Sequence, residues 1–357
     1  MQDFLNSTNF TQIFIALVLI KFLLETYLKI RNLKSIDNNK DSVPPRFKDV
    51  VTEEEYKKSI LYNTDRIKFQ IFTALFGSVV LVIFTIGGLL NYLTQVVMDI
   101  TSSNVLGAVL LGLLLIIVEE IISIPISIYS TFVIEERHGF NKTTRKTFVT
   151  DIFKGLLISG VISSILYATV IFIIISAGDL WWIYAFAAVF TLQAIIFFLY
   201  PVLIMPLFNK FEPLDDEQFK KPIEKLLEKV DFKSKGLFVM NASLRSTHGN
   251  AFFTGFGKNK RIVFFDTLLK TINPDEMEAI LGHELGHYKL GHIRKTLISS
   301  LVFGFLGFYI LNEIFKSDNF FLAHGLENLT VYSKFLMFYL VIGSYTFFTK
   351  PITSALS

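Results

Sequence analysis

Long apolar runs alternate with short polar stretches along this 357-residue chain. Each run holds about 18 or more mostly apolar residues, enough to cross a hydrocarbon core of about 30 Å. The pattern predicts seven membrane-spanning helices, over residues 10–28, 69–94, 105–134, 153–176, 180–208, 293–314 and 331–350. The sequence therefore indicates a mainly α, polytopic membrane protein.

Between the fifth and sixth apolar runs lies a polar segment with a pattern of its own. Lys221 to Val230 has the spacing of an amphipathic helix. Gly236 to Met240 and Arg261 to Phe265 are rich in Val, Ile and Phe and predict short strands, with a turn over 250–259 between them. The sequence thus divides into three expected regions: membrane helices at 1–208, a small α+β domain at 209–292, and membrane helices at 293–357.

Lys and Arg are unevenly distributed among the polar segments. They are frequent after the first, third and fifth apolar runs and absent from 95–104, which follows the second. Because cytoplasmic loops carry an excess of Lys and Arg, this alternation predicts an external N-terminus and a cytoplasmic 209–292 domain.

Composition narrows the classes of function. A net charge of +3 is too small to indicate a nucleic acid partner. The chain has no cysteine, which excludes disulfides, thiolate nucleophiles and cysteine ligands to zinc. The high content of Phe, Ile, Leu and Lys favours a bacterial inner membrane over the endoplasmic reticulum as the location.

One polar stretch carries the residues of a metal site. Asn273, Pro274 and Glu276 form a helix-start signal, namely an N-cap, a first helical residue and a carboxylate that reaches back to the cap. On the helix that follows, His283 and His287 are four residues apart and share a face. Two imidazoles placed in this way can bind one zinc ion.

Glu284 completes a His-Glu-x-x-His pattern, in which zinc activates a water molecule and the carboxylate takes its proton. A chance match in a chain of this length is expected on the order of 1% of the time. We therefore predict one Zn²⁺ per chain, with His283 and His287 as metal ligands and Glu284 as the catalytic residue.

Four further stretches extend this motif into a family resemblance. The chain resembles the integral-membrane zinc metallopeptidases of the CAAX prenyl protease type 1 family. The stretches that carry the resemblance are Glu135–Thr144, Pro206–Leu214, Arg245–Lys258 and Lys260–Leu269.

The resemblance implies about seven transmembrane helices enclosing a chamber, plus a small α+β zincin-like catalytic domain on the cytoplasmic side. It implies cleavage of prenylated CAAX C-termini or, in bacteria, of membrane-associated peptides. The expected partners are a peptide or protein substrate and the lipid bilayer, with no nucleic acid.

The same resemblance assigns a substrate-binding role to His248, Asn250 and Ala251. In the family, this region is similar to a sheet edge against which a peptide is laid as an added strand. An ordinary polar turn is the alternative for these residues.

A catalytic zinc of this kind needs a third protein ligand. The family takes it from a glutamate in an E-x-x-A-D-type segment after the last membrane helix, whereas this sequence ends at Ser357 before such a segment. We expect the 357-residue chain to be a truncation that binds zinc weakly through two histidines and is poorly active.

Two other functions fit parts of the pattern. The missing third ligand would suit a catalytically impaired membrane scaffold or chaperone with the same fold. A site-2-like intramembrane protease would place His-Glu-x-x-His in an apolar helix, but Asp275, Glu276 and Lys289 make this flank too polar.

Overall fold

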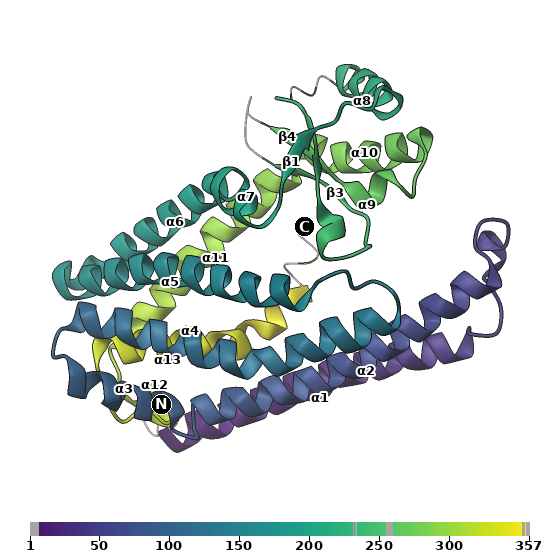
Figure 1. The fold of residues 1–357 in the computed structure, drawn as a ribbon. Coiled ribbons are helices and arrows are strands. Elements are labelled where there is room, and N and C mark those ends of the chain that lie inside the picture. The colour runs from purple at the N-terminus through teal and green to yellow at the C-terminus, as the bar shows by residue number, and fades with distance from the viewer. Residues whose placement is uncertain (1–6, 231, 233, 255–259, 352–353, 355–357) are drawn as a thin grey trace. The chain divides into compact units, whose positions relative to one another are not determined.

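The computed structural model describes residues 7–230, 232, 234–254, 260–351 and 354 (Figure 1). Within these ranges, the side chains of residues 7, 287, 288, 292 and 293 lie outside the description. The helices are α1 (Ser7–Asn38), α2 (Glu53–Phe84), α3 (Leu89–Ile100), α4 (Asn104–Tyr129), α5 (Arg145–Ser176), α6 (Trp181–Leu199), α7 (Met205–Phe208), α8 (Glu217–Lys229), α9 (Asp266–Leu269), α10 (Pro274–Lys289), α11 (His292–Phe315), α12 (Asn319–Ala323) and α13 (Val331–Tyr345). The strands are β1 (Phe211–Pro213), β2 (Leu237–Met240), β3 (Ala251–Thr254) and β4 (Arg261–Phe265).

Six helical segments among the described residues are long and apolar enough to cross a membrane: Glu53–Phe84, Asn104–Glu135, Arg145–Ser176, Gly178–Phe208, Arg294–Phe315 and Val331–Thr349. They correspond to six of the seven predicted spans. The remaining one, predicted at 10–28, lies within the 32-residue helix α1, which is not among the six. The predicted class, a mainly helical multi-pass membrane protein with a small sheet, is confirmed.

The predicted span at 69–94 was wrong at its C-terminal end. Helix α2 stops at Phe84, and a separate helix, α3, begins at Leu89. Gly88 between them has φ +76°, a left-handed conformation that glycine adopts without a steric penalty. The apolar pattern continues across this turn because α3 also packs inward, through Leu90, Leu93 and Val97.

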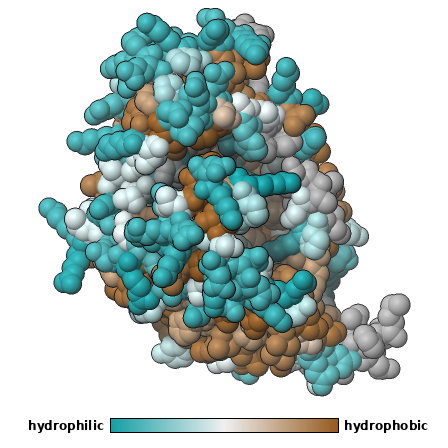
Figure 2. Space-filling view, turned by 90° about the vertical axis from the view of Figure 1, so that its right-hand side faces the viewer, coloured by the Kyte–Doolittle hydropathy of each residue, from teal (hydrophilic) through white to brown (hydrophobic). Residues whose placement is uncertain are grey.

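The surface of α5 shows how these helices meet the membrane. Phe153, Leu157, Val161 and Ile165 recur every four residues and are all exposed. They form one side of the helix. Figure 2 shows that hydrophobic side chains also reach the surface on the face drawn there, together with projecting hydrophilic ones. Such a stripe is unfavourable in water and suits contact with lipid.

The chain divides into two compact units. The first comprises residues 1–138, 159–185 and 307–354, and the second comprises 139–158, 186–306 and 355–357. This division reflects which segments pack against one another. It does not test the domain boundaries predicted after residues 208 and 292, which stay predictions.

Close helix packing in the first unit depends on small residues of α4. A Cβ atom at Gly112 would overlap the ring of Tyr167 on α5, and one at Gly107 would lie 2.7 Å from the ring of Tyr332 on α13. Glycine at these positions lets two aromatic rings lie against the α4 backbone.

The second unit contains a four-stranded sheet with strand order β1-β2-β4-β3. The β2–β4 pair is parallel, whereas β1–β2 and β3–β4 are antiparallel. Helices α8 and α10 complete its core through residues that include Phe219, Ile223, Met277 and Leu281, packed with Ile262 and Phe264 of β4. The predicted strand at 261–265 has the observed bounds, and the helix predicted at 221–230 begins earlier, at Glu217.

A buried histidine ties three helices of the first unit together. His324 follows α12, and its Nδ1–H donates to the Phe320 carbonyl at 2.6 Å, so its Nε2 accepts from the Tyr345 hydroxyl at 3.0 Å. Phe14 of α1 packs edge-on against the imidazole, with ring centroids 4.6 Å apart. Burial lowers the pKa of His324 to about 4.

This lowered pKa predicts acid sensitivity of the first unit. An unfolded chain takes up a proton at His324 near pH 6.5, whereas the folded chain does so only near pH 4. Stability is therefore full above about pH 6.5 and falls by about 1.4 kcal/mol per pH unit as the pH drops towards 4. We expect the unfolding temperature to fall over this window, and to fall less steeply in His324→Asn, whose amide does not titrate. Equal slopes in the two proteins would contradict this assignment.

Candidate functional site

Helix α10 carries the His-Glu-x-x-His motif, and its first turn is capped as the sequence predicts. The Asn273 side chain accepts from the backbone N–H of Glu276 at 2.9 Å. The Glu276 carboxylate accepts from the backbone N–H of Asn273, also at 2.9 Å. This reciprocal pair satisfies two donors that the helix start would otherwise leave free. The helix then runs without interruption through residues 283–287.

The buried face of α10 determines where the motif lies. Met277, Leu281 and Leu285 are 0%, 1% and 4% exposed and pack in the core with α8 and the sheet. At about 100° per residue, positions 283 and 287 lie roughly 200° and 240° round the helix from Leu281. The two histidine positions are therefore neighbours on the side of α10 away from its core.

Side-chain placement in the motif agrees with this geometry where it is described. The side chain of His283 is exposed and that of Glu284 is half-buried. The side chain of His287 lies outside the described residues, so only its backbone position on α10 is given. The structure thus places the three residues on adjacent turns of one helix and leaves their roles as predictions.

The donor chemistry fits a zinc ion in part. Two imidazoles one helical turn apart are a common half of a tetrahedral site, and a carboxylate follows the first of them. Among the side chains that the structure describes, a set that excludes His287, no three His, Asp or Glu residues gather closely enough to hold a metal ion. The described residues therefore leave the third protein ligand unassigned.

Strand β3 is one of the two edge strands of the described sheet and begins at Ala251, directly after the predicted site residues His248 and Asn250. The Phe265 N–H donates to the Asn250 carbonyl at 2.9 Å, and Ala251 lies opposite Phe264. Because opposite residues of an antiparallel pair alternate between bonded and non-bonded positions, the peptide groups of Ala251 and Phe253 face away from β4. The Asn250 side chain accepts from the Ala251 N–H at 2.9 Å.

The segment that leads into this edge is fixed from two sides. The imidazole of His248 stacks on the ring of Phe140, with centroids 4.3 Å apart and an interplanar angle of 19°. The Thr267 hydroxyl donates to the His248 carbonyl at 2.8 Å. A Cβ atom at Gly249 would approach the Leu268 backbone to 3.2 Å. His248, Asn250 and Ala251 therefore form one ordered approach to the sheet edge.

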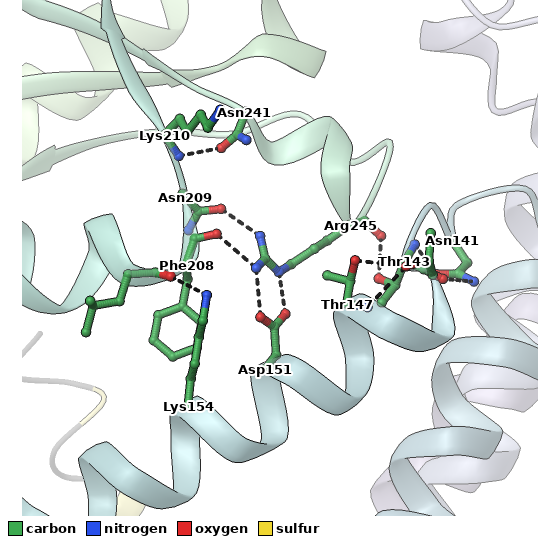
Figure 3. A network of polar contacts seen from close by, with 12 residues as sticks. Asn141, Thr143, Thr147, Asp151, Lys154, Phe208, Asn209, Lys210, Asn241 and Arg245 are labelled. Carbon is green, nitrogen blue, oxygen red and sulfur yellow. Dashed lines mark hydrogen bonds and ion pairs between the residues drawn. The ribbon is translucent and has the colours of Figure 1, made fainter.

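A polar network next to this segment was not anticipated from the sequence. The Arg245 guanidinium binds the Asp151 carboxylate, the Asn209 side chain and the Phe208 carbonyl (Figure 3). Arg245 and Asn209 lie in the stretches that carry the family resemblance, but nothing in the sequence pattern assigned a role to either residue. Asp151 is 94 residues from Arg245, and no sequence spacing could have paired the two.

Comparison with known sequences identifies two families whose profiles together cover most of the chain. The profile of the family described as "CAAX prenyl protease N-terminal, five membrane helices" matches residues 32–210. The profile of peptidase family M48 matches residues 213–357. Together these describe a multi-pass membrane portion followed by a metallopeptidase portion.

Individual relatives match over most of their length. The chain is 34% identical to a CAAX prenyl protease 1 homolog of Arabidopsis thaliana, over 92% of this chain and 79% of that protein. It is 35% identical to CAAX prenyl protease 1 of Saccharomyces cerevisiae, over 85% of this chain and 69% of that protein. The crystal structure of S. mikatae Ste24p has a TM-score of 0.87 at 30% identity, covering 97% of this chain and 84% of that one.

The fold and the motif-bearing helix define a multi-pass membrane metalloendopeptidase. The chain belongs to the CAAX prenyl protease 1 family, within peptidase family M48.

The capping pair of α10 can be tested separately from catalysis. Asn273→Ala removes the side-chain acceptor and should destabilise the first turn by about 1 kcal/mol. We expect amide hydrogen exchange in the first turns of α10 to rise about fivefold. Asn273→Asp keeps a cap acceptor and serves as the matched control. Unchanged exchange in Asn273→Ala would show that the cap does not stabilise α10.

Proposed function

We propose that this chain is a zinc-dependent endopeptidase that cleaves peptide bonds near the C-termini of prenylated CAAX proteins. The observation that carries the proposal is the placement of residues 283, 284 and 287 within little more than one turn of α10. The two histidine positions lie on the side away from the buried face, and the half-buried Glu284 lies at the margin of that face. The names of the relatives, which are CAAX prenyl proteases, support the substrate class.

His283 and His287 are the proposed zinc ligands, with one ion per chain. Zinc held there would supply Lewis-acid polarisation of the scissile carbonyl and lower the pKa of a nearby water molecule. Glu284 follows the first ligand on the same helix, so its carboxylate takes the proton from the attacking water and passes it to the leaving amine. The half-buried position of Glu284 suits a group that must reach both solvent and substrate.

His248, Asn250 and Ala251 are proposed to position the substrate. An extended peptide added to the β3 edge would pair with peptide groups that face away from β4. The stacked ring of His248 and the capped amide of Ala251 fix the start of this edge. Main-chain pairing of this kind gives affinity without dependence on the substrate side chains.

The active site is proposed to face the cytoplasm. The support is the alternation of Lys- and Arg-rich with Lys- and Arg-free segments along the chain. For the host membrane, the eukaryotic sources of the relatives favour the endoplasmic reticulum over the bacterial inner membrane that composition favoured. Membrane-associated peptides other than prenylated ones are the alternative substrate class.

Replacing Glu284 tests the catalytic assignment. Glu284→Gln keeps the size of the side chain but removes the base, so cleavage of a prenylated peptide with a CAAX terminus should fall by about 10²- to 10⁴-fold. Zinc content, measured by mass spectrometry of the purified protein, should not change. Glu278→Gln is the matched control, since Glu278 is exposed on the same helix.

Retained cleavage in Glu284→Gln would refute its role as the base. Absence of both zinc and cleavage in this chain and in a form extended by any native downstream residues would instead favour a membrane scaffold that keeps the fold without catalysis.

Zinc retention tests the ligand assignment independently of activity. His283→Ala and His287→Ala should each lower the bound zinc, since each removes one of the nitrogen ligands. Replacement of His248 should leave the zinc content unchanged, since it is assigned to the substrate. Equal zinc in His283→Ala, His287→Ala and the unaltered chain would contradict a site on α10.

A further inference from the structure

Arg245 joins three segments of the second unit that are far apart in sequence (Figure 3). Its Nε and one Nη donate in parallel to the Asp151 carboxylate of α5, at 2.7 and 2.9 Å. It also donates to the Asn209 side chain and to the Phe208 carbonyl at the end of α7, each at 2.9 Å. One guanidinium thus holds the start of α5, the end of α7 and the approach to β3.

The backbone of the same region adds a short antiparallel pairing. The Lys142 N–H donates to the Arg245 carbonyl at 3.1 Å, and the Thr247 N–H donates to the Phe140 carbonyl, also at 3.1 Å. Asn141 and Ser246 lie opposite each other as an isolated bridge. This pairing brings Phe140 to the place where its ring stacks on His248.

The ion pair between Arg245 and Asp151 is partly shielded from water, with side chains 26% and 25% exposed. Charge-assisted bidentate pairs of this geometry are about twice as strong as neutral hydrogen bonds and fix orientation as well as distance. Lysine could replace the charge but not the fork that meets Asp151, Asn209 and Phe208 together.

We infer that Arg245 is a positioning residue for substrate binding. It acts through residues 246–250, which lead into β3. Arg245 keeps this segment in place next to the loop at 140–142. The inference rests on the proposed function, in which His248, Asn250 and Ala251 lie along the substrate. We call the contacts of Arg245 with Asp151, Asn209 and Phe208 the clamp. Loss of the clamp loosens the start of strand β3 and weakens its pairing with substrate, while the residues on α10 keep their positions.

The primary experiment compares Arg245→Lys and Asp151→Asn with the unaltered chain, using the prenylated CAAX peptide. Each variant should raise KM about tenfold and leave kcat within about twofold, since uniform binding is lost while the reacting groups keep their places. The double variant should be no worse than either single one, because both remove the same contact. Lys221→Ala, which breaks an exposed ion pair on α8, is the control and should change neither constant.

Hydrogen exchange, measured without substrate, reports the clamp directly. Amides of residues 246–254 that the structure describes should exchange faster in Arg245→Lys and in Asp151→Asn, and those of α10 should not. This readout does not depend on cleavage or on zinc.

A covalent substitute for the clamp provides the rescue. The sequence has no cysteine, so Asn141→Cys with Ser246→Cys introduces one pair, at positions whose antiparallel pairing suits a disulfide. In the Arg245→Lys background, the oxidised form should recover KM to within about twofold of the oxidised form that retains Arg245. The reduced form should keep the raised KM.

The outcomes separate the inference from the proposed function. Faster exchange with a raised KM that the disulfide restores supports the clamp. Unchanged exchange in both variants overturns it. Faster exchange with an unchanged KM also overturns it, while His248→Ala and Asn250→Ala still raise KM if the substrate edge is correct. If these two variants leave KM unchanged as well, the proposed edge fails and the clamp fails with it.

Discussion

The burial of one face of α10 is the constraint on which the candidate site depends. Met277, Leu281 and Leu285 must be removed from water, and the core formed by α8 and the sheet accommodates them. Once that face is fixed, the helical repeat leaves positions 283 and 287 no freedom to turn inward. The capped first turn, from Asn273 to Glu276, sets where the repeat begins. The packing of the hydrophobic face of α10 therefore sets the direction in which positions 283 and 287 point.

The sheet contributes a second element, because β3 is one of its two described edge strands. Parallel pairing of β2 with β4 places the buried residues of β4 at the centre of the core. β3 joins on the other side of β4, so half of its peptide groups point away from the sheet. The helix that carries the predicted zinc ligands and this edge strand belong to the same compact unit, which is the arrangement that the proposed binding of an extended peptide requires.

Much of the fold was predictable from the sequence, because many of its elements depend on local patterns of residues. The apolar runs predicted seven membrane-spanning helices, and six of these correspond to described helices of sufficient length and hydrophobicity, since a bilayer core demands about 20 consecutive apolar residues whatever the fold. The cap of α10 and the bounds of β4 were also predictable from the sequence, because each depends on residues only a few positions apart. The break at Gly88 was missed because α3 continues the apolar pattern beyond the turn. The clamp of Arg245 on Asp151 was missed because it joins residues 94 positions apart.

By itself, the sequence determined the class of protein, the helix that bears His283, Glu284 and His287, and the resemblance to a family of membrane metallopeptidases. These follow from residue order alone, through hydrophobic length, helical spacing and capping chemistry. Only the tertiary structure decided which face of α10 is buried, that β3 is an edge strand of the described sheet, and that Arg245 binds Asp151 next to the segment leading into β3. Those features arise from contacts between segments distant in the chain, and the free energy of such contacts depends on how the whole core closes.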